Sequence, residues 1–217
     1  AAALTNAFVE GSSRILDRSE VNARRRSEGK LPGNLILTRD GGDTVPRLQP
    51  IRERFGFGWA CFVEMPVERG IAKVLGMEGV DVPRLAGPEE YATWAARAAD
   101  ALEDHQALYV HLKGPDVPAH DGRALEKRDV IELIDRAFFA EVVPRLDLRR
   151  TVVAVTADHA TSCLRKAHTA EAVPLLVAGA GVAPDGVSTF GERAAAGGAL
   201  GALRGVQILP RLRDLLA

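Results

Sequence analysis

The sequence predicts an α/β fold with a largely parallel sheet, and two observations support this. Short apolar runs are each followed by a polar or glycine-bearing turn, as expected of buried strands. These runs alternate with longer segments of helical periodicity, the order typical of a parallel sheet. Strands are predicted over residues 34–38, 58–63, 107–112, 151–156 and 174–178.

Helices are predicted where apolar residues recur every three or four positions. The best-defined start is Pro88, followed by Glu89 and Glu90, because proline fits the first turn and the acids suit the positive end of the helix dipole. The predicted helices cover residues 4–17, 67–75, 88–104, 124–143 and 206–216.

The composition is that of an ordinary globular protein: 217 residues, 47% hydrophobic and 26% charged, with a formal net charge of -1. This balance predicts neither a nucleic-acid nor a membrane partner, and no apolar run is long enough for a transmembrane span. Cys61 and Cys163 are too few for a disulfide framework, which favours a reducing, cytoplasmic setting. No signal peptide is predicted, and nothing indicates an oligomeric state.

A domain boundary is predicted near residue 86. The stretch 80–87, which contains Pro83 and Gly87, reads as a junction. A basic, turn-rich region precedes it, whereas the strongest strands and every histidine follow it. The sequence is therefore divided into residues 1–85 and 86–217.

Five polar residues near the ends of predicted strands form a candidate metal site. Ligands bind beyond the carboxyl ends of strands in an open parallel sheet, so side chains that follow two such ends can converge. Two carboxylates and three imidazoles suit Mn²⁺ or Zn²⁺, whereas Mg²⁺ is the least natural occupant. The candidate ligands are Asp116, His120, Asp158, His159 and His168.

Their number indicates two ions rather than one. Five ligands are too many for one catalytic ion with an open position and too few for two complete ions, and paired ions about 3.5–4 Å apart are typical of phosphoryl transfer. Each of these residues alone would be read as a solvated loop residue, so the combination carries the prediction. His105 and His111 are set apart: His105 ends a helix, and His111 is predicted to be a satisfied core histidine.

The motifs around these residues resemble the archaeal-type cofactor-independent phosphoglycerate mutases of the alkaline phosphatase superfamily. Landmarks such as Asn22, Gly76 and Lys127 extend the resemblance over nearly the whole chain. The motifs are VHLKGPD at 110–116, HDG at 120–122, IELID at 131–135, TADHAT at 156–161, KAHT at 166–169 and VPLL at 173–176.

The resemblance implies an alkaline-phosphatase-like three-layer sandwich over residues 86–217, and part of a smaller inserted α/β domain that covers the substrate over residues 1–85. It also implies two divalent ions, with Mn²⁺ favoured over Zn²⁺ and Mg²⁺. Asp116, His120 and His168 would hold one ion, and Asp158 and His159 the other. The implied reaction interconverts 3-phosphoglycerate and 2-phosphoglycerate through a phosphoserine.

Two further family features have no match in this sequence: an N-terminal aspartate beside a glycine, and the serine nucleophile. The expectation is that the segment carrying them is missing, and that the 217 residues alone have little or no mutase activity.

The substrate implied by the resemblance is a small phosphorylated acid, which needs cationic and amide partners. Lys113 is a candidate catalytic residue because it lies beside the predicted metal loop and can neutralise phosphate charge. The resemblance suggests that Asn34 and Arg39 face the substrate; otherwise the basic segment around them is a solvated face.

Two alternatives remain open. One is a hydrolase of the same superfamily, such as a phosphatase, phosphodiesterase or sulfatase, in which water takes the phosphoryl group. The other is a catalytically dead metal-binding or scaffold protein, which the unmatched nucleophile would support.

Overall fold

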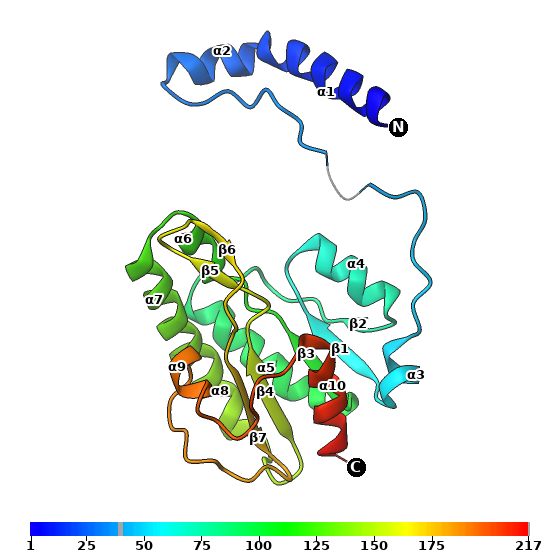
Figure 1. Ribbon diagram of the computed structural model, residues 1–217, viewed down its shortest axis with the longest axis vertical. Helices are drawn as coiled ribbons and strands as arrows, with labels where there is room; N and C mark the ends of the chain where they lie inside the picture. Colours follow the sequence, from blue (N-terminus) through cyan, green and yellow to red (C-terminus); the bar gives the residue numbers. More distant parts are fainter. Residues whose placement is uncertain (39–40, 217) are drawn as a thin grey trace. The chain divides into compact units, whose positions relative to one another are not determined.

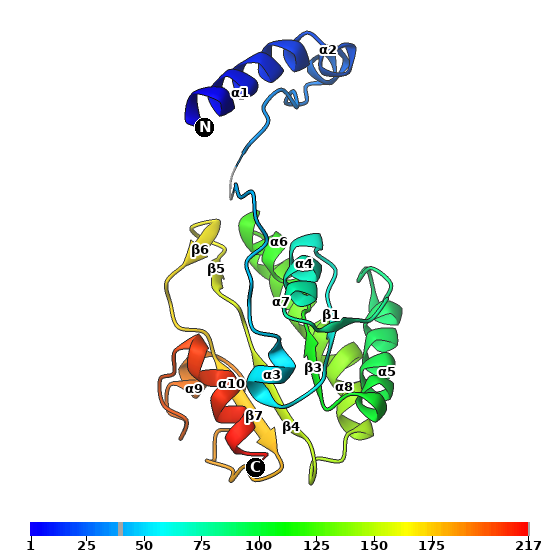
Figure 2. The ribbon, with the colours of Figure 1, turned by 90° about the vertical axis from the view of Figure 1, so that its right-hand side faces the viewer.

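A computed structural model describes residues 1–38 and 41–216 (Figures 1 and 2). The contacts divide the chain into two compact units, Ala1–Pro46 and Arg47–Ala217. None of the described helices is both long and apolar enough to cross a membrane. The helices are α1 (Ala2–Asp17), α2 (Glu20–Ser27), α3 (Ile51–Phe55), α4 (Pro66–Val74), α5 (Pro88–Asp104), α6 (Asp116–His120), α7 (Ala124–Ile134), α8 (Ala140–Val142), α9 (Glu192–Ala195) and α10 (Gly205–Asp214). The strands are β1 (Trp59–Phe62), β2 (Glu78–Gly79), β3 (Ala107–Val110), β4 (Val152–Thr156), β5 (Ala160–Ser162), β6 (Ala167–Thr169) and β7 (Leu175–Gly179).

The first unit is held together by the buried side chain of Asn22. Its Nδ2 donates to the backbone oxygens of Leu16, at 2.7 Å, and Gly33, at 3.2 Å, and its Oδ1 accepts from Gly33 N at 2.8 Å. Ser19 caps α2 by accepting a hydrogen bond from Asn22 N. The sequence analysis missed α2 because its run of arginines was read as a turn, although Ser19 followed by an acidic residue is a helix-start signal.

The strand predicted over residues 34–38 is wrong. These residues form no strand, and Leu35 and Leu37 are 59% and 82% exposed. An apolar run becomes a strand only when another segment supplies hydrogen bonds to its backbone, and no described segment does so here. The amide of Asn34, a predicted substrate contact, donates to Asp17 Oδ1 at 3.0 Å. Arg39, the other one, lies outside the described residues.

The second unit contains a parallel sheet with strand order β2-β1-β3, which confirms the α/β prediction. Alternate residues of β1 face opposite sides. Phe62 faces α5, where its ring centroid lies 6.1 Å from that of Trp94, whereas Cys61 packs with Ala72 of α4. Helix α4 packs on one face of the sheet and α5 on the other, so this part of the unit has three layers (Figure 2).

The core on the α5 side is built around Trp94, which is fully buried. Its indole Nε1 donates to Pro83 O at 2.7 Å, which ties the segment before α5 to the helix. The helix predicted over 124–143 forms as α7 and α8 joined by a π-helical turn, Asp135–Phe139, whose Phe138 enters the same core. The predicted helix 88–104 matches α5 at both ends.

Strands β4 and β7 depart from the parallel arrangement. They pair antiparallel with each other, and in the described part of the chain neither pairs with β1–β3. The chain between them forms a short antiparallel hairpin, β5 and β6, which the sequence analysis did not predict. In this hairpin Thr161 lies opposite His168. Its turn contains Lys166, at φ +51°, whose N donates to Ser162 O at 2.7 Å.

The division of the chain differs from the predicted boundary near residue 86. The compact units separate between Pro46 and Arg47, and β1, which precedes residue 86, pairs along its whole length with β3, which follows it. The Pro-containing stretch 80–87 therefore connects elements of one unit. That residues 1–85 belong to a substrate-covering domain stays a prediction.

Candidate metal centre

Asp116, His120 and His168 form a compact cluster. Asp116 begins α6 and His120 ends it, so their side chains lie four residues apart on one face of the helix. His168 reaches them from β6, and the potential ligand atoms of the three residues all lie within 4.8 Å of one another. His120 Nε2 is 3.4 Å from Asp116 Oδ1, and His168 Nε2 is 3.7 Å from the same oxygen.

The hydrogen bonds of this cluster fit a cation. His120 Nδ1 lies 3.2 Å from the backbone oxygen of Lys166, which can only accept, so the Nδ1 proton points there. The Nε2 lone pair of neutral His120 then faces His168 Nε2, 3.1 Å away. A carbonyl partner of this kind on the outer nitrogen is typical of metal-bound histidines. Two imidazole nitrogens and a carboxylate oxygen are thus directed at one small volume.

Asp158 and His159 lie beside this cluster. His159 Nε2 is 3.1 Å from Asp158 Oδ2, and the backbone N of His159 donates to Asp158 Oδ1. The ring centroids of His159 and His168 are 3.7 Å apart. His159 thus contacts the cluster through His168, and Asp158 is linked to the cluster only through His159.

Lys113 lies next to the cluster, and its Nζ is 3.1 Å from Asp116 Oδ2. Partial burial of Asp116 opposes ionisation, but hydrogen bonds from Thr161 and Lys113, together with the Lys113 charge, outweigh it and hold the pKa of Asp116 below its usual range. The carboxyl group is thus kept in the charged form that binds a cation.

Thr161 is a site residue that the sequence analysis missed. It is 7% exposed, its Oγ1 donates to Asp116 Oδ1 at 2.9 Å, and the same oxygen lies 3.1 Å from His159 Nδ1. Lys127 of α7 donates to the backbone oxygen of Thr161 at 2.8 Å. The available signal was that Thr161 lies in the same TADHAT motif, two residues after His159.

His111 and His105 lie outside the cluster, as predicted. His111 is partly buried, but it is not satisfied: its Nδ1 lies 3.2 Å from Glu68 Oε2, and neither atom makes a well-aligned hydrogen bond in the described part of the chain. His105 caps the end of α5 and contacts Glu78, whose hydrogen bond raises the pKa of the imidazole.

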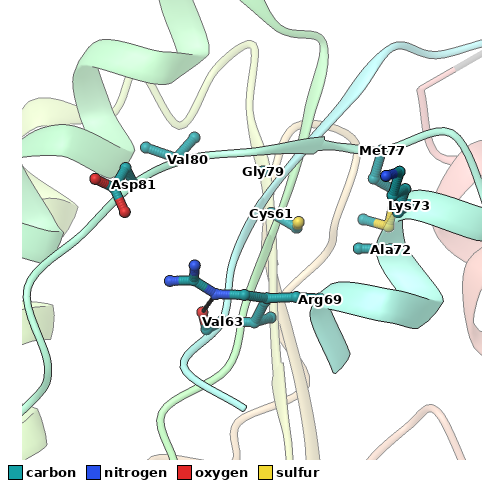
Figure 3. Close-up of a pocket in the computed structure, with 9 residues that line it drawn as sticks. All are labelled: Cys61, Val63, Arg69, Ala72, Lys73, Met77, Gly79, Val80 and Asp81. Carbon is teal, nitrogen blue, oxygen red and sulfur yellow. Dashed lines mark hydrogen bonds between the residues drawn. The ribbon is translucent and has the colours of Figure 1, made fainter. Parts of the chain in front are cut away.

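A separate cavity of about 280 Å³ lies between the sheet and α4 (Figure 3). None of the five candidate ligands lines it. Burial raises the pKa of the Cys61 thiol in its wall, and Arg69 at its rim donates to Val63 O. A protonated thiol is a poor nucleophile, so this cavity offers no obvious chemistry.

Comparison with known proteins identifies the relatives of this chain. A family model described as the metalloenzyme superfamily matches residues 19–210. Among curated proteins, the 2,3-bisphosphoglycerate-independent phosphoglycerate mutase of Aeropyrum pernix is 40% identical and covers 100% of this chain and 52% of its own length. The protein of the same name from Methanoculleus marisnigri is 38% identical, with 97% and 51% covered. This chain thus spans about half the length of the curated relatives it matches.

Two solved structures are also similar to this chain. The PH0037 protein from Pyrococcus horikoshii superposes with a TM-score of 0.83 at 32% identity, over 99% of this chain and 57% of the other. The cofactor-independent phosphoglycerate mutase of Thermoplasma acidophilum gives a TM-score of 0.62 at 31% identity, over 100% and 52%. Because the family model covers most of the sequence, and these structures share its fold, the chain belongs to the metalloenzyme superfamily.

Proposed function

We propose that this chain supplies the metal-binding part of a phosphoglycerate mutase that interconverts 3-phosphoglycerate and 2-phosphoglycerate without a bisphosphoglycerate cofactor. The observation that carries the proposal is the cluster of Asp116, His120 and His168, with the pair His159 and Asp158 beside it, in a chain whose curated relatives bear that name. Because the chain spans about half of those relatives, the activity is proposed for the gene product that carries this sequence.

In this proposal Asp116, His120 and His168 hold one divalent ion, and Asp158 and His159 contribute to a second. Divalent ions in such pairs stabilise the negative charge of a transferring phosphoryl group. The residues themselves fix the ligand atoms: the short helix α6 sets the spacing of Asp116 and His120, and the β5–β6 hairpin brings His168 back to them. The imidazole-rich set favours Mn²⁺ over Mg²⁺.

Lys113 is proposed to neutralise charge on the phosphorylated substrate. Its ammonium group contacts Asp116 Oδ2, which holds it at the edge of the cluster. Asn34 and Arg39 remain proposed substrate contacts. The two free cysteines, Cys61 and Cys163, support a reducing, cytoplasmic setting.

The test is conversion of 3-phosphoglycerate to 2-phosphoglycerate by the gene product that carries this sequence, with Mn²⁺ added and bisphosphoglycerate omitted. Conversion that a chelator abolishes and Mn²⁺ restores is the expected result. Asp158→Asn, which keeps the shape but removes the charge, should lower turnover by roughly 100-fold, because a proposed ligand of the second ion loses its negative charge. Asp147→Asn is the matched control, because Asp147 is exposed and paired with Arg149 away from the cluster.

Two results would contradict the proposal. If no mutase product forms but a simple phosphate ester is hydrolysed, water rather than glycerate accepts the phosphoryl group and the protein is a hydrolase. If Asp158→Asn and Asp147→Asn behave alike, Asp158 takes no part in the reaction.

A further inference from the structure

We propose that Thr161 is a positioning residue that couples the two halves of the metal centre through its side-chain hydroxyl. This inference rests on the proposed function in one respect, namely that the five candidate ligands bind metal. Thr161 is not itself a ligand in this scheme. Its hydroxyl touches one residue of each half: Asp116 of the first cluster and His159 of the neighbouring pair.

The number of protons fixes the direction of both hydrogen bonds. A hydroxyl has one proton, and an ionised carboxylate can only accept. The Thr161 proton therefore goes to Asp116 Oδ1, 2.9 Å away. The contact of 3.1 Å between Thr161 Oγ1 and His159 Nδ1 then requires the imidazole to donate. In its neutral form His159 is consequently held as the Nδ1–H tautomer, in which Nε2 carries the lone pair.

The lone pair of neutral His159 faces a carboxylate. His159 Nε2 lies 3.1 Å from Asp158 Oδ2, so two acceptors face each other there, and a cation bound by both atoms would relieve their repulsion. A histidine can bind a cation only through an unprotonated ring nitrogen, and an acceptor on the opposite nitrogen selects the tautomer and fixes the ring. The Thr161 hydroxyl accepts a hydrogen bond from Nδ1 of His159, just as the backbone oxygen of Lys166 accepts one from Nδ1 of His120.

The hydroxyl is well placed because Thr161 itself is held from three sides. Its side chain is nearly fully buried, its backbone pairs with His168 in the hairpin, and its carbonyl accepts a hydrogen bond from Lys127 at 2.8 Å. A branched side chain also has few χ1 rotamers, so threonine holds the oxygen more firmly than serine would.

The experiment compares Thr161→Val, which keeps the shape but removes the hydroxyl, with Thr161→Ser, which retains it. Ser162→Ala is the matched control. It also removes a hydroxyl from β5, but the Ser162 hydroxyl accepts from Arg165 N and does not contact the cluster. The first readout is the tautomer of His159 in the metal-free protein, from ¹⁵N NMR of the imidazole nitrogens. The second is the affinity for Mn²⁺, from titration followed by electron paramagnetic resonance.

The unaltered protein and Ser162→Ala should show His159 protonated at Nδ1. Thr161→Val should give a mixture with the Nε2–H form and lose roughly 10–100-fold in Mn²⁺ affinity, the usual effect of removing an outer-shell partner. Thr161→Ser should stay much closer to the unaltered protein.

An Nε2–H tautomer in the unaltered protein would overturn the proposal, and this measurement holds even if Thr161→Val does not fold. An unchanged tautomer and unchanged Mn²⁺ affinity in a folded Thr161→Val protein would overturn it equally. Neither readout needs turnover, so the absence of mutase activity would contradict the proposed function while leaving the coupling by Thr161 standing.

Discussion

Replacing Trp94 by phenylalanine should destabilise the second unit by more than the same change at Trp59. Both indoles bury their N–H group, but only that of Trp94 has a partner, Pro83 O at 2.7 Å; Trp59 Nε1 has none in the described part of the chain. The chain contains only these two tryptophans, so each variant also keeps one as a fluorescent reporter.

The magnitude follows from two contributions. A phenyl ring buries roughly 50 Å² less than an indole, which is about 1 kcal/mol of the free energy of unfolding. At Trp94 the change also removes the hydrogen bond to Pro83 O, which contributes about 1 kcal/mol because Pro83 is exposed and water can replace the lost donor. The expected loss is therefore about 2 kcal/mol for Trp94→Phe and about 1 kcal/mol or less for Trp59→Phe, where an unpaired buried N–H is removed.

Thermal unfolding followed by circular dichroism measures the difference. For a protein of this size, about 2 kcal/mol should lower the Tm by roughly 4–8 °C, and the effect of Trp59→Phe should be no more than about half of that. Equal losses in the two variants would refute the reasoning, because the lost ring area, rather than the lost hydrogen bond, would then set the cost.

Three further outcomes are expected. Asn22→Ala removes three side-chain hydrogen bonds worth about 1 kcal/mol each and should abolish slow hydrogen exchange in the first unit, whereas Asn6→Ala, on the exposed face of α1, should not. The hydrogen bond that His105 Nε2 donates to Glu78 raises the pKa of His105, so its stabilisation is present below the ordinary value near 6.5 and is lost as pH rises through the folded pKa. Glu78→Gln should lower that pKa in an NMR titration, and an unchanged value would exclude the pairing. His168→Ala should weaken Mn²⁺ binding on the order of 100-fold in calorimetry, while His105→Ala, remote from the cluster, should leave it unchanged; similar losses would contradict the ligand assignment.

Local signals predicted the longer helices α1, α4, α5, α7 and α10, but not α2. Helix α5 was placed correctly at both ends because Pro88, the acidic residues after it and its apolar period all lie within the helix itself. The strand predicted over 34–38 failed because strand formation depends on a partner elsewhere in the chain. Strands β5 and β6 were not found because three residues are too few to show a period.

Some residues of the candidate site could likewise be predicted from local motifs, whereas others could not. Asp116, His120 and His168 were predicted from motifs near the ends of strands, and the structure brings them together. Thr161 was missed because its importance depends on Asp116, 45 residues earlier, and a threonine in a short polar segment is ordinarily a surface residue. Its role became visible only from its contacts with Asp116 and His159 in the folded chain.

The register of the β5–β6 hairpin has a consequence for how this sequence can vary. Shifting the pairing by one residue would turn Thr161 and His168 to the opposite face and disperse the cluster. The left-handed turn at Lys166 sets that register. Leu164, in the same turn, is 97% exposed, so its identity matters little to packing. The number of residues in this turn is therefore far more constrained than their nature: substitutions there should be tolerated, and a single insertion should not.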